Sequence, residues 1–194
     1  MSDIILASGS ASRRSILEGA GVPFRIVRPG VDEDALKQTL TDKTPSELSL
    51  ALAEAKALSI SEPGAFVIGS DQVLEFEGEA FDKPESKDEL RDRLIAMSGK
   101  PHFLRGGTVV VKHGAVVERI QESSTLTMRD FAPEEIEFYL DAISDDVLRT
   151  VGGYEFEGLG ARLFGNIEGD FFAILGLPLM PLLKVLRREG ALSW

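Results

Sequence analysis

Two serines and two arginines follow the first apolar segment of the chain. Ser8, Ser10, Arg13 and Arg14 come directly after residues 4–7, where a strand gives way to a helix. The free N–H groups and the dipole at a helix N-terminus favour an anion, and arginine can hold a phosphate through two parallel hydrogen bonds. Arginine in the first helical turn opposes the dipole unless an anion is bound. The segment predicts a phosphate site, with an ordinary serine cap beside solvated arginines as the alternative.

Two acidic positions could serve metal or proton chemistry. Asp71 follows the apolar segment 66–68, and Glu33 lies in the acidic cluster 32–34. Side chains at the rim of a sheet are held in place by a rigid scaffold, and hard cations such as Mg²⁺ prefer carboxylate oxygens. The alternatives are a turn or cap residue for Asp71 and a solvated loop for the cluster.

Two lysines could neutralise phosphate charge. Lys56 lies at the edge of an apolar helical stripe, and Lys83 lies in a short segment before Pro84. Either lysine could act as a point cation on a phosphate, although lysines that extend along an amphipathic surface are commoner. The two histidines, His102 and His113, are too few and too dispersed for a metal cage.

A glycine-rich segment near residues 152–160 could approach a planar ligand. Its glycines allow close approach of the backbone, Tyr154 and Phe156 could stack on a base, and Glu157 could accept hydrogen bonds from a base edge. A tight loop between strands explains the same composition without a ligand. The sequence alone leaves both interpretations open.

The elements that must position these residues alternate between strand and helix. We expect helices after Ser10 and from Thr44, Ser86 and Pro133, where caps or an N-terminal proline are present, and a last helix ending near 187–190. Strands are expected at 4–7, at 66–68 ending in residues 69–72, at 108–111 and 115–120 as a hairpin around His113-Gly114, and near 126–128. This order predicts an α/β fold, with a mixed twisted sheet and flanking helices. We expect one domain over 1–194, with a cleft between two closely packed lobes.

Composition narrows the function classes. The chain has 194 residues, 43% of them hydrophobic, which suffices for a sizeable core. It has no cysteine, which excludes disulfides and thiolate chemistry. A net charge of −11 disfavours binding of nucleic acid through bulk charge. No signal peptide or membrane-spanning run is present, so we expect a cytoplasmic protein without membrane or nucleic-acid partners.

Taken in order, eight segments resemble the motifs of the Maf family of nucleoside triphosphate pyrophosphatases. The matching segments are Leu6-Ala7-Ser8-Gly9-Ser10 with Arg13-Arg14, the region around Glu33, Ala53-Glu54-Ala55-Lys56-Ala57, Ile68-Gly69-Ser70-Asp71, Lys83-Pro84, Met97-Ser98-Gly99, Phe156-Glu157-Gly158, and Ile167-Glu168-Gly169 through Gly176-Leu177-Pro178-Leu179. The resemblance covers essentially the whole chain. It implies a Maf/ITPase-like fold and hydrolysis of a nucleoside triphosphate to the monophosphate and pyrophosphate with Mg²⁺ or Mn²⁺.

The resemblance also implies roles for individual residues. Asp71 matches the family's proton acceptor. The predicted catalytic residues are Asp71, Glu33 and Lys83; the predicted metal ligands are Glu33 and Asp71; and the predicted substrate-binding residues are Ser8, Ser10, Ser12, Arg13, Arg14, Lys56, Gln72 and Glu157. The resemblance further suggests a homodimer and a house-cleaning role in nucleotide pools.

Base specificity depends on fewer positions. Gln72 and Glu157 resemble the subgroup that acts on 7-methyl-GTP, and a carboxylate can accept hydrogen bonds from both N1–H and the 2-amino group of guanine. Ser12 stands where that subgroup often has an aromatic side chain, Arg105 precedes a glycine pair, and residues 149–151 differ from the family's usual stretch. The alternatives are a dTTP/UTP pyrophosphatase of the same family and a non-catalytic nucleotide sensor that acts on cell division.

Overall fold

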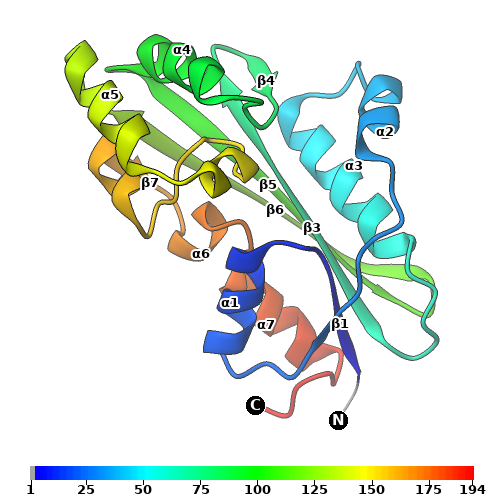
Figure 1. Cartoon of the computed structure of the whole chain (residues 1–194). Helices are drawn as coiled ribbons and strands as arrows, with labels where there is room; N and C mark the ends of the chain where they lie inside the picture. Colours follow the sequence, from blue (N-terminus) through cyan, green and yellow to red (C-terminus); the bar gives the residue numbers. More distant parts are fainter. Residues whose placement is uncertain (1–2) are drawn as a thin grey trace. The chain divides into compact units, whose positions relative to one another are not determined.

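The computed structural model describes residues 3–194, which form a mixed β-sheet flanked by helices (Figure 1). The strands are β1 (Ile4–Ala7), β2 (Arg25–Ile26), β3 (Phe66–Phe76), β4 (Glu79–Phe81), β5 (Pro101–Lys112), β6 (Ala115–Met128) and β7 (Phe164–Glu168). The α-helices are α1 (Ala11–Gly19), α2 (Glu33–Thr39), α3 (Pro45–Leu58), α4 (Lys87–Met97), α5 (Pro133–Ala142), α6 (Phe171–Ile174) and α7 (Leu179–Arg188). Two 3₁₀ helices, η1 (Asp145–Arg149) and η2 (Leu159–Leu163), precede β7.

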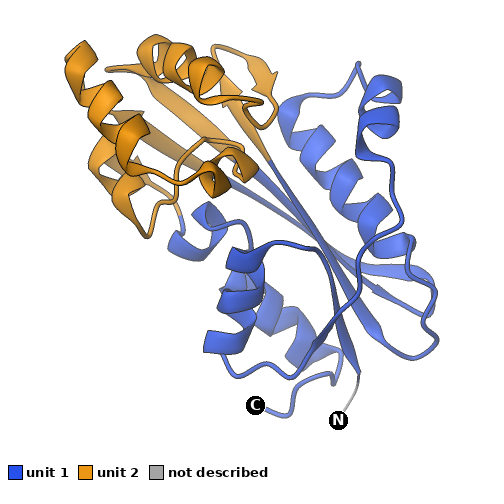
Figure 2. Ribbon diagram, in the orientation of Figure 1, with its two compact units in different colours: residues 1–72, 105–123, 170–194 blue, residues 73–104, 124–169 orange. Residues whose placement is uncertain are grey.

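The seven strands form one sheet in the order β2-β1-β3-β5-β6-β7, with β4 paired to β3. β1 runs parallel to β2 and β3, and Ala7 pairs with Gly69. The chain divides into two compact units (Figure 2). Unit 1 comprises residues 1–72, 105–123 and 170–194, and unit 2 comprises residues 73–104 and 124–169; β3, β5 and β6 contribute residues to both.

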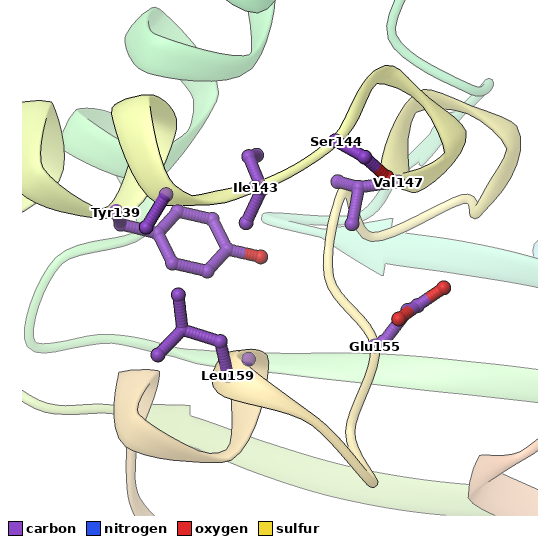
Figure 3. Close-up of a pocket in the computed structure, with 8 residues that line it drawn as sticks. Tyr139, Ile143, Ser144, Val147, Glu155 and Leu159 are labelled. Carbon is purple, nitrogen blue, oxygen red and sulfur yellow. The ribbon is translucent and has the colours of Figure 1, made fainter.

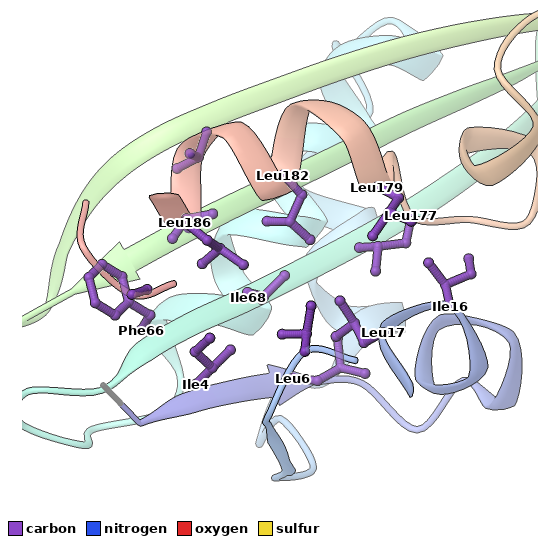
Figure 4. Packing of buried hydrophobic residues seen from close by; sticks show 14 of the residues in the cluster. Ile4, Leu6, Ile16, Leu17, Phe66, Ile68, Leu177, Leu179, Leu182 and Leu186 are labelled. Carbon is purple, nitrogen blue, oxygen red and sulfur yellow. The ribbon is translucent and has the colours of Figure 1, made fainter. Parts of the chain in front are cut away.

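The core of unit 1 lies on both faces of its sheet. On one face, Ile4, Leu6, Phe66 and Ile68 belong to a buried cluster with residues of α1 and α7, among them Leu17, Leu182 and Leu186 (Figure 4). On the other face, Ile5, Ala7 and Val67 pack with Ala53 and Ala57 of α3. Successive residues of a strand face opposite sides, and a parallel strand covered on both faces is apolar throughout. The continuous apolar run of residues 4–7 therefore reflects burial between helices.

Unit 2 carries its own helical layer. Helices α4 and α5 contact each other, and α4 also contacts η1. Helix α4 buries Leu90, Leu94 and Met97, while α5 buries Ile136 and Leu140. None of the helices described for residues 3–194 is long and apolar enough to span a bilayer.

Several predicted elements are confirmed. β1, the helix after Ser10, the helix from Thr44, the hairpin around His113-Gly114 and the last helix lie where the sequence placed them. Thr44 and Glu47 form the expected reciprocal capping box. His113 and Gly114 both adopt positive φ, as the two central residues of a tight hairpin turn require.

Two predictions of strand extent are wrong, and the helices α2 and α6 were not predicted. The strand expected to end in residues 69–72 continues to Phe76: β1 pairs with it as far as Gly69, β4 pairs with residues 74–76, and β5 is its other neighbour in the sheet. The segments at 115–120 and 126–128 are parts of the single strand β6. The acidic cluster around Glu33 begins helix α2, with the Asp32 carboxylate capping the N–H of Ala35, in place of a loop.

Candidate active site

A buried lysine joins two carboxylates in unit 1. The Nζ atom of Lys56 lies 2.6 Å from Oδ1 of Asp71 and 3.0 Å from Oε2 of Glu33. The Lys56 and Asp71 side chains are only 8% and 12% exposed, whereas Glu33 is 42% exposed. The alternatives of a surface lysine and a turn aspartate are therefore wrong for Lys56 and Asp71, whereas the Glu33 carboxylate keeps contact with solvent. Electrostatic interactions among such sheltered groups are stronger than in bulk water.

The close packing of α3 on β3 creates this cluster. A Cβ atom at Gly69 would lie 2.1 Å from the carbonyl oxygen of Ala53 and 2.7 Å from the amide nitrogen of Ala57. Only a glycine allows the strand and the helix to approach so closely. Lys56 precedes Ala57 on the helix and Asp71 lies two residues after Gly69 on the strand, so this contact sets their separation.

The serines and Arg13 at the entrance of α1 form a second group in unit 1. Ser10 is the N-cap of α1, and its Oγ accepts a hydrogen bond from the Arg13 N–H. The Oγ of Ser8 accepts from the Ser10 N–H and from Nη1 of Arg13, both at 3.2 Å. Nε of Arg13 donates to the carbonyl oxygen of Gly176 at 2.7 Å. These bonds fix the guanidinium beside the end of β1.

The two groups influence each other electrostatically. Burial lowers the pKa of Arg13, while the negative charges of Asp71 and Glu33 act in the opposite direction. The interaction is stronger than it would be in water, because protein has a lower effective dielectric constant. Arg13 and Lys56 thus supply positive charge to the same carboxylates from α1 and α3.

The turn after α6 anchors several of these segments. The carbonyl oxygen of Gly176 accepts from Ser70 Oγ at 3.0 Å as well as from Arg13, and Thr108 Oγ1 donates to Ser70 Oγ at 3.0 Å. Gly176 has a φ of +100°, which side-chain-bearing residues rarely adopt. No residue pattern predicted these roles for the Ser70 and Thr108 hydroxyls or for the Gly176 carbonyl. A glycine two residues before Pro178, after a short apolar run, was the available signal for the turn.

Gln72 is held by the same short helix. Its Nε2 donates to the carbonyl oxygens of Ala173 at 2.9 Å and Ile174 at 3.3 Å. The amide nitrogen therefore satisfies carbonyl groups at the end of α6, and the amide oxygen is the atom through which Gln72 could contact a ligand. Its predicted role in substrate binding stays a prediction.

The remaining predicted residues of α1 are more exposed. Arg14 is exposed and pairs with Glu18 at 3.7 Å, one turn along the helix. Ser12 is half-buried in the first turn of α1. Among the described residues, neither makes a hydrogen bond or ion pair with Lys56, Asp71 or Glu33, and the roles of both stay predictions.

Two predicted residues belong to unit 2. Lys83 and Glu157 are both exposed. Tyr154, expected to stack on a base, is instead buried, with its hydroxyl 2.7 Å from Nε2 of His102 and its ring 4.9 Å from that of Phe164. The stacking prediction for Tyr154 is therefore wrong, because its ring forms part of the interior of unit 2.

A cavity of about 140 Å³ opens in unit 2 between α5, η1 and η2 (Figure 3). Its lining includes Tyr139, Ile143, Val147, Glu155 and Leu159. The Tyr139 hydroxyl is already engaged, since it donates to the Gly153 carbonyl at 2.9 Å. None of the predicted site residues is among those that line this cavity.

Comparison with known proteins identifies relatives along the whole chain. Residues 3–189 match the Maf family, described as "Maf-like protein". A "Nucleoside triphosphate pyrophosphatase" of Maricaulis maris is 43% identical over 100% of both chains, and another, of Caulobacter vibrioides, is 45% identical over 100% of this chain and 98% of the relative. A "7-methyl-GTP pyrophosphatase" of Mesorhizobium japonicum is 44% identical over 98% of each chain.

Proposed function

This chain belongs to the Maf family, and we propose that it hydrolyses 7-methyl-GTP at the Lys56–Asp71–Glu33 cluster, releasing 7-methyl-GMP and pyrophosphate. Its family and relatives make it a nucleoside triphosphate pyrophosphatase, a hydrolase of phosphoanhydride bonds. The observation that carries the assignment of the centre is Lys56, which lies within 3.0 Å of two carboxylates in a sheltered site. Removal of modified nucleotides from the nucleotide pool is the house-cleaning role that follows.

Asp71 acts as the general base in this proposal. It accepts a proton from the water that attacks the phosphorus, and the phosphoanhydride bond between the α and β phosphates breaks. A general base needs hydrogen-bond reach to its water, and the fixed Asp71 carboxylate, held by Lys56 at 2.6 Å, is oriented for that purpose. Phosphoryl transfer requires mainly positioning and charge stabilisation, so one oriented base suffices on the protein side.

The cations bind the triphosphate and stabilise the charge that develops on pyrophosphate. Arg13 offers a planar guanidinium oriented by Ser8 and Gly176, and Lys56 offers a point charge beside Asp71. The Ser10 hydroxyl and the N–H groups at the start of α1 add hydrogen-bond donors. Lys83, an exposed lysine of unit 2, is proposed as the further cation that catalysis needs.

The carboxylates of Glu33 and Asp71 fit a divalent cation. Mg²⁺ is usually held by one or two carboxylates together with substrate phosphates, and these two oxygens approach one point, because both lie within 3.0 Å of the same Lys56 nitrogen. Among the described residues, no group of three or more His, Asp or Glu side chains could hold a metal alone. A bound Mg²⁺ or Mn²⁺ would polarise the phosphate oxygens.

Glu157 is proposed to read the base. A carboxylate accepts hydrogen bonds from both N1–H and the 2-amino group of guanine, and its negative charge suits the positive charge of 7-methylguanine. Glu157 is exposed at the end of the glycine-rich segment, so its carboxylate is accessible to a ligand. The 7-methyl-GTP pyrophosphatase of Mesorhizobium japonicum, at 44% identity, supports this choice over dTTP or UTP.

A panel of triphosphates tests the activity. Purified protein is incubated with Mg²⁺ or Mn²⁺ and with 7-methyl-GTP, GTP, dTTP or UTP, and pyrophosphate release is measured. Asp71→Asn should lower kcat by about 10²–10⁴-fold while nucleotide binding persists, since it removes the base but leaves the cations Arg13 and Lys56 that bind the triphosphate. Asp34→Asn, at an exposed aspartate next to Glu33, is the matched control and should leave kcat unchanged. Binding without turnover by the wild type would favour a sensor.

Substitution of Glu157 tests the substrate assignment. Glu157→Gln should raise KM for 7-methyl-GTP by about tenfold, the effect of losing one charge-assisted hydrogen bond, with less effect on dTTP. Glu155→Gln is the control, since Glu155 is also exposed and lies two residues away on the same segment. Equal effects of Glu157→Gln on all four triphosphates would contradict base recognition by this residue.

A further inference from the structure

Arg93 is a buried arginine in the interior of unit 2. It lies on α4 between Leu90 and Leu94, and its side chain is 5% exposed. Arginine is almost never buried without partners, because removing its charge from water is costly unless hydrogen bonds and an opposite charge compensate. The partners of this guanidinium therefore indicate why it is buried.

The guanidinium of Arg93 binds two segments that are far apart in the sequence. Its Nη1 donates to the carbonyl oxygens of Asp82 at 2.7 Å and Val151 at 2.9 Å. Its Nη2 donates to the Glu89 carboxylate at 2.8 Å, and its Cζ lies 5.1 Å from the centre of the Phe81 ring. A single nitrogen thus bridges the backbone before Lys83 to the backbone at the start of the glycine-rich segment.

Both segments carry a residue assigned to the substrate. Lys83 directly follows Asp82, and Glu157 lies six residues after Val151. Movement of the Asp82 carbonyl therefore displaces the proposed phosphate cation. Movement of the Val151 carbonyl displaces the segment that carries Glu157, the residue proposed to hydrogen-bond the base.

The segment from Val151 toward Glu157 is stiff enough to transmit such a displacement. The Tyr139 hydroxyl donates to the Gly153 carbonyl at 2.9 Å, the Tyr154 N–H donates to Thr150 Oγ1 at 3.1 Å, and the Tyr154 hydroxyl lies 2.7 Å from His102 Nε2. These bonds anchor Gly153 and Tyr154 to α5, to β5 and to the preceding turn. Arg93 adds the bond that relates it to the segment of Lys83.

We propose that Arg93 is a positioning residue for substrate recognition, which holds the Lys83 segment and the Glu157 segment in one fixed arrangement within unit 2. The proposal rests on the proposed function, because it takes Lys83 as a phosphate ligand and Glu157 as a base ligand. A nucleotide that contacts both residues benefits from the bridge, whereas a ligand that has phosphates and no base does not. Arg93 itself contacts no substrate.

The test compares a nucleotide with a ligand that lacks a base. Steady-state kinetics with 7-methyl-GTP give kcat and KM, and inorganic tripolyphosphate is measured as a competitive inhibitor. Arg93→Met keeps the length and packing of the side chain without its donors, and Arg93→Lys restores a cation that can donate to carbonyl oxygens. Arg91→Met is the matched control, since Arg91 lies on the same helix and pairs with Glu137 and Asp88 side chains, not with either segment.

Arg93→Met should raise KM for 7-methyl-GTP by about tenfold, because small misplacements of binding groups are costly, and should change the tripolyphosphate inhibition constant by less than about twofold. Arg93→Lys should recover part of the loss and keeps the test valid if the methionine variant does not fold. Arg91→Met should match the wild type. If Arg93→Met changed the KM for 7-methyl-GTP and the tripolyphosphate inhibition constant by the same factor, or changed neither, the positioning role would be overturned. A wild type that hydrolyses no triphosphate would instead overturn the proposed function together with this inference.

Discussion

Replacing Lys56 with methionine should destabilise the protein through the two carboxylates left behind. Lys56 lies 2.6 Å from Asp71 and 3.0 Å from Glu33, and its side chain is 8% exposed. Methionine retains the apolar packing of the lysine stem while removing the charge. The variant therefore isolates the electrostatic contribution of Lys56 from its contribution to packing.

The exposure of the partners sets the size of the effect. Removing one partner of a buried ion pair costs about 3–5 kcal/mol, because an uncompensated charge stays buried. Asp71, at 12% exposure, meets this condition, but Glu33, at 42% exposure, can recover hydration. We therefore expect Lys56→Met to lower the free energy of unfolding by about 3 kcal/mol, at the lower end of that range.

A double-mutant cycle with Asp71→Asn measures the interaction itself. Asp71→Asn should cost about 1 kcal/mol, since the amide oxygen still accepts a hydrogen bond and Lys56 keeps Glu33. In the double variant no buried aspartate charge remains, so its loss should be smaller than the sum of the single losses by about 1–2 kcal/mol. Urea unfolding monitored by circular dichroism gives all three values, with the m-value as a check on two-state behaviour.

A surface pair provides the control for this cycle. Lys100 lies 2.9 Å from Glu77, with exposures of 50% and 64%, and Lys100→Met should cost less than about 1 kcal/mol. Losses of Lys56→Met and Asp71→Asn that add within about 0.5 kcal/mol would refute the argument, because independent sites behave in that way. Such a result would mean that Lys56 and Asp71 contribute to stability independently of each other.

Three further predictions concern the scaffold. Gly69→Ala should lower stability by about 1–3 kcal/mol and reduce kcat, since the new methyl group meets α3; Gly19→Ala, which has open space around it, should do neither. Burial lowers the pKa of His102 from 6.5 to about 4. Between these two pH values His102 is protonated in the unfolded chain but not in the folded chain, so the free energy of unfolding falls as the pH decreases from 6.5 towards 4. Urea unfolding at pH 7 and pH 5 should show the wild type losing about 2 kcal/mol more than His102→Gln, and equal losses would contradict this. Thr44→Ala should cost about 1 kcal/mol by removing the cap of α3, measured by thermal unfolding, and a neutral result would show that the cap contributes nothing.

Short-range sequence patterns predict the local elements, and the ordered motifs identify the family. The run of apolar residues at 4–7, the cap at Ser10 and the capping box from Thr44 to Glu47 each follow from short-range patterns, and each is present in the structure. Such features depend on neighbours within about one helical turn, which a single sequence displays directly. The eight ordered motifs identified the family, because their combination is far more specific than any one of them.

Strand length and burial were harder to predict. The polar residues Ser70, Asp71 and Gln72 resemble the end of a strand, yet β3 continues through them to residues 74–76, which pair with β4, and β5 is its neighbour in the sheet. Tyr154 looked available for stacking, since local sequence cannot reveal that His102 and Phe164 enclose its ring. Tertiary pairing overrides local preference in both cases.

Only the tertiary structure brought the proposed catalytic residues together. Lys56, Asp71 and Glu33 come from three different elements: Lys56 and Asp71 meet because α3 packs directly on the glycine of β3, and Glu33 joins them from α2, which contacts α3. Arg13 is fixed by the carbonyl of Gly176, 163 residues away along the chain. Periodicity tells which face of a helix or strand is buried, but which buried faces meet depends on strand pairing and packing over long separations. The residue types therefore indicated which side chains could bind phosphate or accept a proton, whereas the packing of the fold determined which of them lie together.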